Sequence, residues 1–277
     1  IWSREEIQLR KKTIEDAGGW SADTLSEDLD LAFRAQLKDW KVIYDVDVEA
    51  PAEIPVTMND FKAQQYRWTK GKAQVIRKLT GSINKSKIPL WTKIHIYFDL
   101  YNILTIPSIM VLAILSIPLL FILDSTSEYN TFLSFFSLAL VNVVLAPLFG
   151  WNVFKHYNKT TWGALKEMLI YFMPFTFVLL GMSVFQLTSM IDGFVSDKVY
   201  FKRTGKFNIT EDGGTWKDKV YKPSEIPFIT YLEGLMVFYF IWGLVIDFQL
   251  MTFGFLPFHI VLVSGFSYVF YLSIKKA

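Results

Sequence analysis

Residues 100–123 read LYNILTIPSIMVLAILSIPLLFIL, a stretch with no charged side chain. As a helix rising about 1.5 Å per residue, it is long enough to cross the hydrocarbon core of a bilayer. The whole chain of 277 residues is 52% hydrophobic and 17% aromatic, which is too much for an ordinary soluble fold of this size. The excess falls in residues 100–274, whereas residues 1–99 are rich in Lys, Glu and Asp. The sequence therefore predicts a mainly α protein, with a soluble segment followed by a polytopic bundle of transmembrane helices.

Further apolar stretches predict membrane spans at about 131–151, 231–249 and 253–273. Residues 61–98, just before the first span, contain nine Lys or Arg residues and no Asp or Glu. Basic residues that flank a span favour the cytoplasmic side. The N-terminal segment, the basic loop at about 193–230 and the C-terminus are therefore predicted to be cytosolic. A plasma or inner membrane is favoured.

The apolar region at 167–192 does not fit this scheme as one crossing, because the polar segments on both sides of it are basic. Pro174 and Gly181 interrupt it. We expect this region to re-enter the membrane or to lie at its interface, so that both flanking loops stay on the same side.

The soluble segment has α/β character. Thr24 and Glu27 have the spacing of a capping box, and apolar residues follow at helical spacing, which predicts a helix at about 25–38. Alternation of apolar and polar residues at 42–49 predicts a strand, and a helix is expected again from Asn59. Aromatic and basic residues mix in the following stretch, so residues 81–99 are expected to include an amphipathic helix at the membrane surface.

Composition excludes some kinds of site. The chain has no cysteine, so disulfides, thiolate chemistry and cysteine metal sites are excluded. The net charge is +2, and no nucleic-acid partner is expected. The first residue is Ile1 and no signal-peptide pattern follows, so we expect an upstream part of the protein to be missing. The oligomeric state is not predicted.

Ser26-Glu27-Asp28 opens the first predicted helix and follows Gly18-Gly19-Trp20. Acids in a first helical turn commonly do no more than complement the helix dipole. A carboxylate at the mouth of a sugar site can also accept the proton of an attacking hydroxyl, which direct glycosyl transfer with inversion requires. Asp28 is the candidate base, with Glu27 and Asp30 as competitors.

Gln64, Arg67 and Trp68 lie at positions i, i+3 and i+4 of the next predicted helix, so they share a face. Trp and Arg also serve as ordinary anchors at a membrane interface. The combination suggests a binding site, because an Arg guanidinium matches a pyrophosphate and an indole can stack on a sugar ring.

A third group lies in the basic loop between apolar regions. Residues 201–206 read FKRTGK, and most such loops only determine topology.

Taken in order, the three groups resemble motifs of processive family 2 glycosyltransferases, which include cellulose, mannan and related β-glycan synthases. Ser26-Glu27-Asp28 is similar to the family's Thr-Glu-Asp motif, in which the Asp is the catalytic base. Gln64, Arg67 and Trp68 match the Q-x-x-R-W motif in type and spacing. The resemblance implies that Gln64 and Arg67 contact the nucleotide diphosphate and that Trp68 lies under the acceptor end of the glycan.

Phe201, Thr204 and Lys206 resemble the family's gating loop, F-x-V-T-x-K, although Arg203 stands where that version has Val. The resemblance implies that this loop covers the donor and contacts its diphosphate. Such a role requires the loop to be cytosolic, in agreement with its basic charge.

The resemblance implies three parts. Residues 1–80 would be the C-terminal remnant of a cytosolic α/β GT-A domain, residues 81–99 the interfacial helix, and residues 100–277 the transmembrane region. The GT-A portion with its D-x-D carboxylates would lie upstream. Mg or Mn is therefore expected for the full-length enzyme, but no metal ligand is expected in this chain.

The implied activity is inverting transfer of a hexose from a UDP- or GDP-sugar to a growing β-glycan, which then passes through the bilayer. The chain alone is expected to be inactive. Two alternatives remain open at this point: a nonprocessive family 2 transferase that acts on a lipid carrier, and a noncatalytic subunit for membrane transport or assembly.

Overall fold

The computed structural model describes residues 11–43, 55–125, 160–196 and 227–275, together with Trp151 and Lys155. This part of the chain is mainly helical, as predicted, and contains no strand. The strand predicted at 42–49 falls mostly outside the described residues, and so does the span predicted at 131–151.

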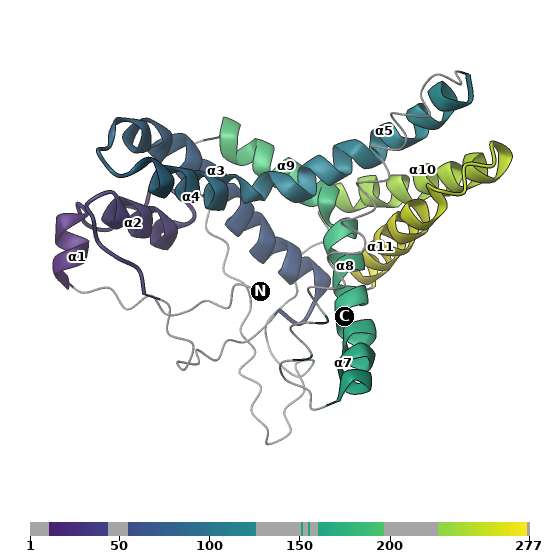
Figure 1. Cartoon of the computed structure of the whole chain (residues 1–277), viewed down its shortest axis with the longest axis horizontal. Coiled ribbons are helices and arrows are strands. Elements are labelled where there is room, and N and C mark those ends of the chain that lie inside the picture. The colour runs from purple at the N-terminus through teal and green to yellow at the C-terminus, as the bar shows by residue number, and fades with distance from the viewer. Residues whose placement is uncertain are drawn as a thin grey trace. The chain divides into compact units, whose positions relative to one another are not determined.

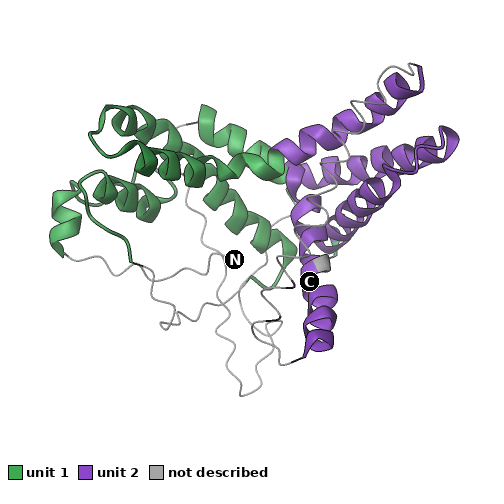
Figure 2. Ribbon diagram, in the orientation of Figure 1, with its two compact units in different colours: residues 1–107, 185–227, 275–277 green, residues 108–184, 228–274 purple. Residues whose placement is uncertain are grey.

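The chain divides into two compact units, which are coloured separately in Figure 2. Unit 1 comprises residues 1–107, 185–227 and 275–277, and unit 2 comprises residues 108–184 and 228–274. The helices of unit 1 are α1 (Lys11–Asp16), α2 (Glu27–Gln36), α3 (Met58–Lys85), α4 (Leu90–Tyr101) and most of α9 (Ser183–Val195). Those of unit 2 are most of α5 (Thr105–Ser125), and α7 (Thr161–Glu167), α8 (Met173–Gly181), α10 (Ile229–Gln249) and α11 (Leu256–Ile274), all drawn in Figure 1.

Helix α3 is the long central element of unit 1. It begins after Thr57, whose hydroxyl oxygen accepts the backbone N–H of Asp60 at 3.1 Å and donates to the Asp60 carboxylate at 2.8 Å. The first of these bonds satisfies a free N–H of the first turn. The helix ends at Lys85, and Ser86 is its C-cap residue, three residues before Pro89. The helix predicted from Asn59 is thus confirmed.

The core of unit 1 forms where α2 and α4 pack on α3, and Phe194 of α9 packs against the same core. Its buried apolar residues are Phe33, Val75, Ile76, Leu79, Ile83, Ile96 and Leu100. Four of them repeat along α3 at helical spacing, which explains why this helix is the common support for the others.

Helix α2 is shorter than the predicted 25–38, and the predicted capping box is wrong. Ser26, not Thr24, occupies the N-cap position, and its side chain makes no capping hydrogen bond. A tertiary contact with α3 explains this difference. The backbone N–H of Leu25 donates to the Gln74 side chain at 3.0 Å, so the turn before α2 is bonded to α3 instead of to its own helix.

Four helical segments in the described ranges are long and apolar enough to cross a membrane. They are Leu90–Ser125, Thr161–Gly181, Ile229–Gln249 and Leu256–Ile274. The last two confirm the helices predicted at 231–249 and 253–273. The first joins α4 to α5 through a short 3-10 turn, Asn102–Leu104, so the apolar helix begins before the predicted residue 100.

The core of unit 2 draws on α5, α10 and α11, with Val184 from the first turn of α9. Its buried residues are Met110, Ala113, Ile117, Val184, Phe240, Leu262 and Phe266. Many large apolar side chains on the outer faces of the same helices are exposed, as lipid-facing positions should be.

The apolar region at 167–192 is divided into two helices. A π-helical segment, Met168–Phe172, precedes Pro174, whose missing N–H interrupts the hydrogen-bond ladder. Helix α8 then ends at Gly181, and α9 begins at Ser183. The break predicted at Gly181 is therefore present. Re-entry into the membrane remains a prediction.

Candidate functional site

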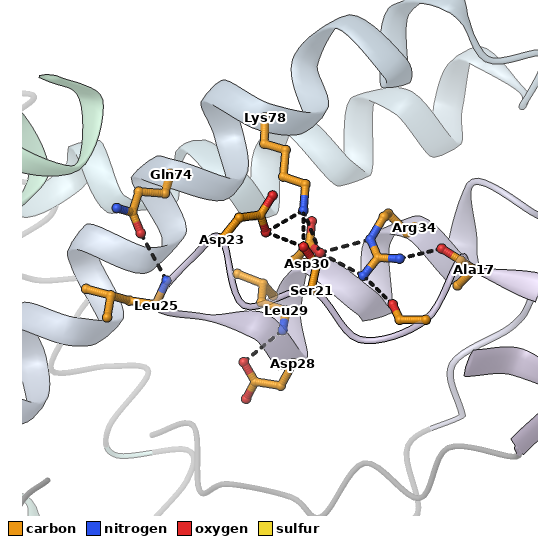
Figure 3. A network of polar contacts seen from close by, with 11 residues as sticks. Ala17, Ser21, Asp23, Leu25, Asp28, Leu29, Asp30, Arg34, Gln74 and Lys78 are labelled. Atoms are coloured by element: carbon orange, nitrogen blue, oxygen red, sulfur yellow. Dashed lines mark hydrogen bonds and ion pairs between the residues drawn. The ribbon is translucent and has the colours of Figure 1, made fainter. Parts of the chain in front are cut away.

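The acidic motif lies at the N-terminus of α2. Glu27 and Asp28 are exposed there, whereas Asp30 is completely buried. One carboxylate oxygen of Asp28 accepts the backbone N–H of Leu29 at 2.8 Å, and Figure 3 shows the side chain pointing away from the network around Asp30. Of the three acids considered from the sequence, Asp28 and Glu27 are thus accessible to a substrate.

Asp30 has a structural role. Its carboxylate forms ion pairs with Arg34 at 2.8 Å and with Lys78 of α3 at 3.0 Å. The Arg34 guanidinium also donates to the carbonyl oxygens of Ala17 and Gly19, which fixes the turn before the motif (Figure 3). Because Asp30 is buried and paired with two cations, it is not positioned to take a proton from a substrate.

Lys78 also holds the loop that leads to α2. Its ammonium group donates to the Asp23 carboxylate at 2.8 Å, and the Ser21 hydroxyl donates to the same carboxylate at 2.5 Å. Hydrogen bonding from Lys78, followed by that from Ser21, lowers the pKa of Asp23. The loop from Ser21 to Asp30 is therefore tied to α3 by a charged contact at each end.

The acidic turn lies directly on α3. Gly71 faces Ser26 so closely that a Cβ atom at Gly71 would lie 2.8 Å from the Ser26 nitrogen and 2.9 Å from the Ser26 Cβ. One turn further along α3, Gln74 accepts the Leu25 N–H. Only a residue without a side chain at position 71 permits this approach.

The second motif continues on the same helix. Gln64 and Trp68 are partly exposed, and Arg67 is buried. Gly71 follows Arg67 by four residues and Gln64 by seven, so the three positions lie along one side of α3. The structure therefore places Ser26 of the acidic motif against α3 at Gly71, about one helical turn from Arg67 of the Q-x-x-R-W motif.

A neighbouring face of α3 binds α9. Asp192 of α9 accepts hydrogen bonds from Lys70 at 2.7 Å and from the Tyr66 hydroxyl. Gly193 lies so near α3 that a Cβ there would be 2.6 Å from the Lys70 carbonyl oxygen. Sequence reasoning missed this contact. The i, i+4 spacing of Tyr66 and Lys70 is a signal that they share a face, but nothing in the sequence identifies Asp192 as their partner.

The contact changes the ionisation of both α3 residues. Burial, and then the hydrogen bond to Asp192, raises the pKa of Tyr66. Burial acts to lower the pKa of Lys70, but the bonds to Asp192 and Tyr66 outweigh it, and that pKa is raised. Lys70 is thus held as a cation.

Gln74 links the two contacts, and sequence reasoning missed it too. Its side chain is 2% exposed. The amide oxygen accepts the Leu25 N–H, and the amide nitrogen donates to the Ser196 carbonyl oxygen at 3.4 Å. One buried amide therefore contacts both the acidic turn and the end of α9.

The predicted gating loop and the metal site are considered last. Phe201, Thr204 and Lys206 lie outside the described residues. Among the described residues there is no group of three or more His, Cys, Asp or Glu side chains that could hold a metal ion.

Comparison with known proteins gives a match to the model of glycosyl transferase family group 2 over residues 7–191, more than half of the chain. The matched region contains the first two motifs but not residues 201–206. No solved structure matches the chain.

Among curated relatives, glucomannan 4-beta-mannosyltransferase 1 of Oryza sativa subsp. japonica is 41% identical over 95 residues, which is 34% of this chain and 18% of the relative. Glucomannan 4-beta-mannosyltransferase 7 of Arabidopsis thaliana is 37% identical over 93 residues, 33% of this chain and 17% of the relative. The match thus covers less than a fifth of either relative.

Proposed function

This chain belongs to glycosyl transferase family group 2, and from that premise we propose that it carries the acceptor-side residues of a membrane enzyme that transfers a hexose to a β-glycan. The proposal rests mainly on the close packing of Ser26 against Gly71 of α3. Because of this contact, the acidic turn lies one helical turn from Arg67. The relatives are named as glucomannan mannosyltransferases, so mannose is the first sugar to test.

In the proposed reaction a glycan hydroxyl attacks the anomeric carbon of a nucleotide sugar. The new C–O bond forms as the bond to the diphosphate breaks, and the electron pair leaves with the nucleoside diphosphate. Asp28 accepts the hydroxyl proton, with Glu27 as its neighbour. Its exposure, and the orientation of its carboxylate by Leu29, support this role.

Gln64 and Arg67 would contact the departing diphosphate, whose negative charge a guanidinium stabilises. The partly exposed indole of Trp68 would stack on the acceptor sugar. Phe201, Thr204 and Lys206 are proposed to cover the donor. Mg or Mn would neutralise diphosphate charge, but the described residues do not fit a metal site, so no step here depends on one.

Activity is tested most directly in a chimera. The matched segment of the rice enzyme is replaced by the corresponding residues of this chain, and the chimera is expressed in yeast membranes. Membranes receive radiolabelled UDP- and GDP-hexoses, and label is counted in polymer and in lipid extracts. We expect label in polymer, none with Asp28→Asn in the chimera, and none with the unmodified chain alone.

The other results have defined meanings. Label confined to the lipid extract would instead support transfer to a lipid carrier. A folded chimera without any incorporation, next to an active rice enzyme, would contradict a catalytic role and favour a noncatalytic membrane subunit.

Sidedness has a separate test. We propose that the N-terminal segment, the loop at 193–230 and the C-terminus are cytosolic, since nucleotide sugars bind on that side in the proposed reaction. The chain contains three glycosylation acceptor sequences, beginning at Asn84, Asn158 and Asn208. Expression with microsomes should leave all three unmodified, and a glycan on any of them would contradict the topology.

A further inference from the structure

Three polar side chains meet inside unit 2, away from the candidate site. Ser116 of α5, Asp247 of α10 and His259 of α11 are each no more than 1% exposed. The His259 Nδ1 atom lies 2.6 Å from an Asp247 carboxylate oxygen, and the Nε2 atom lies 2.9 Å from the Ser116 hydroxyl oxygen. All three helices belong to segments long and apolar enough to cross a membrane. Ionisable residues at such positions are costly, so they point to a specific role.

The surroundings of the pair are apolar and closely packed. The imidazole stacks against Phe240 and Phe255, with ring centroids 6.5 and 6.3 Å away. Gly243 of α10 lies so close that a Cβ there would be 3.4 Å from the His259 Nε2 atom. The other carboxylate oxygen of Asp247 accepts the Thr252 hydroxyl at 3.2 Å. The pair is therefore fully enclosed by protein, and its charges are compensated locally.

The order Ser, His, Asp resembles a nucleophilic triad, but the hydrogen bonds exclude that role. The Ser116 hydroxyl donates its proton to the Ala113 carbonyl oxygen at 2.7 Å. A serine whose proton is already given to its own helix cannot give it to His259. The bond between Ser116 and His259 must then be donated by the imidazole Nε2–H.

The remaining ring nitrogen faces Asp247. If both carboxylate oxygens accept bonds, from Thr252 and from His259, the Nδ1 atom also carries a hydrogen. We propose that Asp247 and His259 form a buried proton-binding site, an imidazolium paired with a carboxylate. Through Ser116 it joins α5 to the α10–α11 hairpin. The pair is neutral as a whole.

On α5, α8, α10 and α11, no other charged side chain lies within two helical turns of Ser116, Asp247 or His259. On α10 the nearest is Glu233, about four turns before Asp247, and on α5 it is Asp124, about two turns after Ser116. Helix α11 carries no charged residue besides His259, and α8 carries none. Loss of either partner would thus leave one polar or charged group buried without compensation. The packing of α5, α10 and α11 against one another would then be weaker.

The proton count can be measured in the whole chain, because it has only three histidines. The protein is labelled with ¹⁵N-histidine, placed in lipid nanodiscs at pH 7.5, and compared with its His259→Gln variant to assign the resonances. We expect both His259 ring nitrogens to show N–H signals with imidazolium shifts. A His259 ring with one protonated nitrogen would overturn the proposal, whatever the activity of the enzyme.

Variants of Asp247 and Ser116 test whether the buried pair holds α5, α10 and α11 together. Asp247→Asn should convert His259 to the neutral ring and lower the Tm by on the order of 10 °C, whereas Ser116→Ala should lower it much less and leave the ring an imidazolium. If Asp247→Asn does not fold, the spectrum of the unaltered chain still decides. A stable Asp247→Asn protein whose His259 remains an imidazolium would also contradict the pairing.

Discussion

Ser26 rests on Gly71 with no room for a side chain between them, since a Cβ at Gly71 would lie 2.8 Å from the Ser26 nitrogen. A glycine in the middle of a helix costs about 1 kcal/mol relative to alanine. Its presence in α3 is explained by the approach of the acidic turn, which could not otherwise reach the side of α3 that carries Arg67.

Gly71→Ala should therefore destabilise unit 1 and displace Asp28, despite the better helix propensity of alanine. The clash involves the backbone of Ser26, which cannot rotate away, so we expect a loss of about 1–3 kcal/mol. Gly81→Ala in the same helix is the matched control. Nothing lies within 4 Å of a Cβ there, so this change should stabilise by about 0.5–1 kcal/mol. Thermal unfolding of both variants is the measurement, and equal effects would contradict the close contact.

Asp28 and Asp30 should respond differently to the same chemical change. Asp28→Asn should lower sugar transfer by the chimera at least 100-fold with little effect on stability, because the side chain is exposed. Asp30→Asn should destabilise by on the order of 2–3 kcal/mol, since Arg34 and Lys78 lose their buried partner. Transfer assays and unfolding curves are compared for both variants. A stable Asp30→Asn protein, or an active Asp28→Asn chimera, would reverse these assignments.

Gln74→Met keeps the size of the side chain but removes both hydrogen bonds. The buried Leu25 N–H then has no acceptor on α3, which costs about 1–3 kcal/mol. Hydrogen exchange of peptides covering residues 21–29 should speed up. Gln65→Met, at a partly exposed position of the same helix, serves as the control and should leave this exchange unchanged. Unaltered exchange in Gln74→Met would show that Gln74 does not hold the acidic turn.

Family membership and the helical membrane segments could be predicted from the sequence because both depend on local information. Three short motifs in order indicated the family, and the match over residues 7–191 confirms it. Apolar stretches indicated the helices α5, α10 and α11. The start of α2 was predicted wrongly, because its preceding turn bonds to Gln74, 49 residues away, and not to its own helix.

The arrangement of the candidate site could not be predicted from the sequence, because it depends on tertiary contacts. Sequence spacing placed Gln64, Arg67 and Trp68 on one face, but it could not choose among the acids at the start of α2. Burial removes Asp30, which is paired inside the unit, and leaves the exposed Asp28 and Glu27 as candidates. The contact of Asp192 with α3 joins helices distant in sequence, and the pair of Asp247 with His259 joins two consecutive helices. Sequence spacing carries no signal for either contact.

The contact of α9 with α3 should weaken in alkali. The folded-state pKa values of Tyr66 and Lys70 lie above their ordinary values of 10.0 and 10.5. Their contribution to stability is therefore complete below about pH 10 and is lost as the pH rises through the folded-state values. Unfolding of the chain and of Tyr66→Phe is compared from pH 8 to 11. We expect the variant to be less stable at pH 8 and the difference to shrink above pH 10. A constant difference would contradict this coupling.

Helices α8 and α11 cross at two glycines in unit 2. A Cβ at Gly181 would lie 2.7 Å from the Gly265 carbonyl carbon, and one at Gly265 would lie 2.6 Å from the Phe177 carbonyl oxygen. Within a membrane, such close packing holds helices together because burial from water no longer contributes. Gly181→Ala and Gly265→Ala both meet backbone atoms of the facing helix, so each should lower the Tm. Gly254→Ala, where nothing lies within 4 Å, should leave the Tm unchanged in nanodiscs. If Gly265→Ala were as stable as Gly254→Ala, the two helices could not cross as closely as described, and α8 would have to be held by its other contacts.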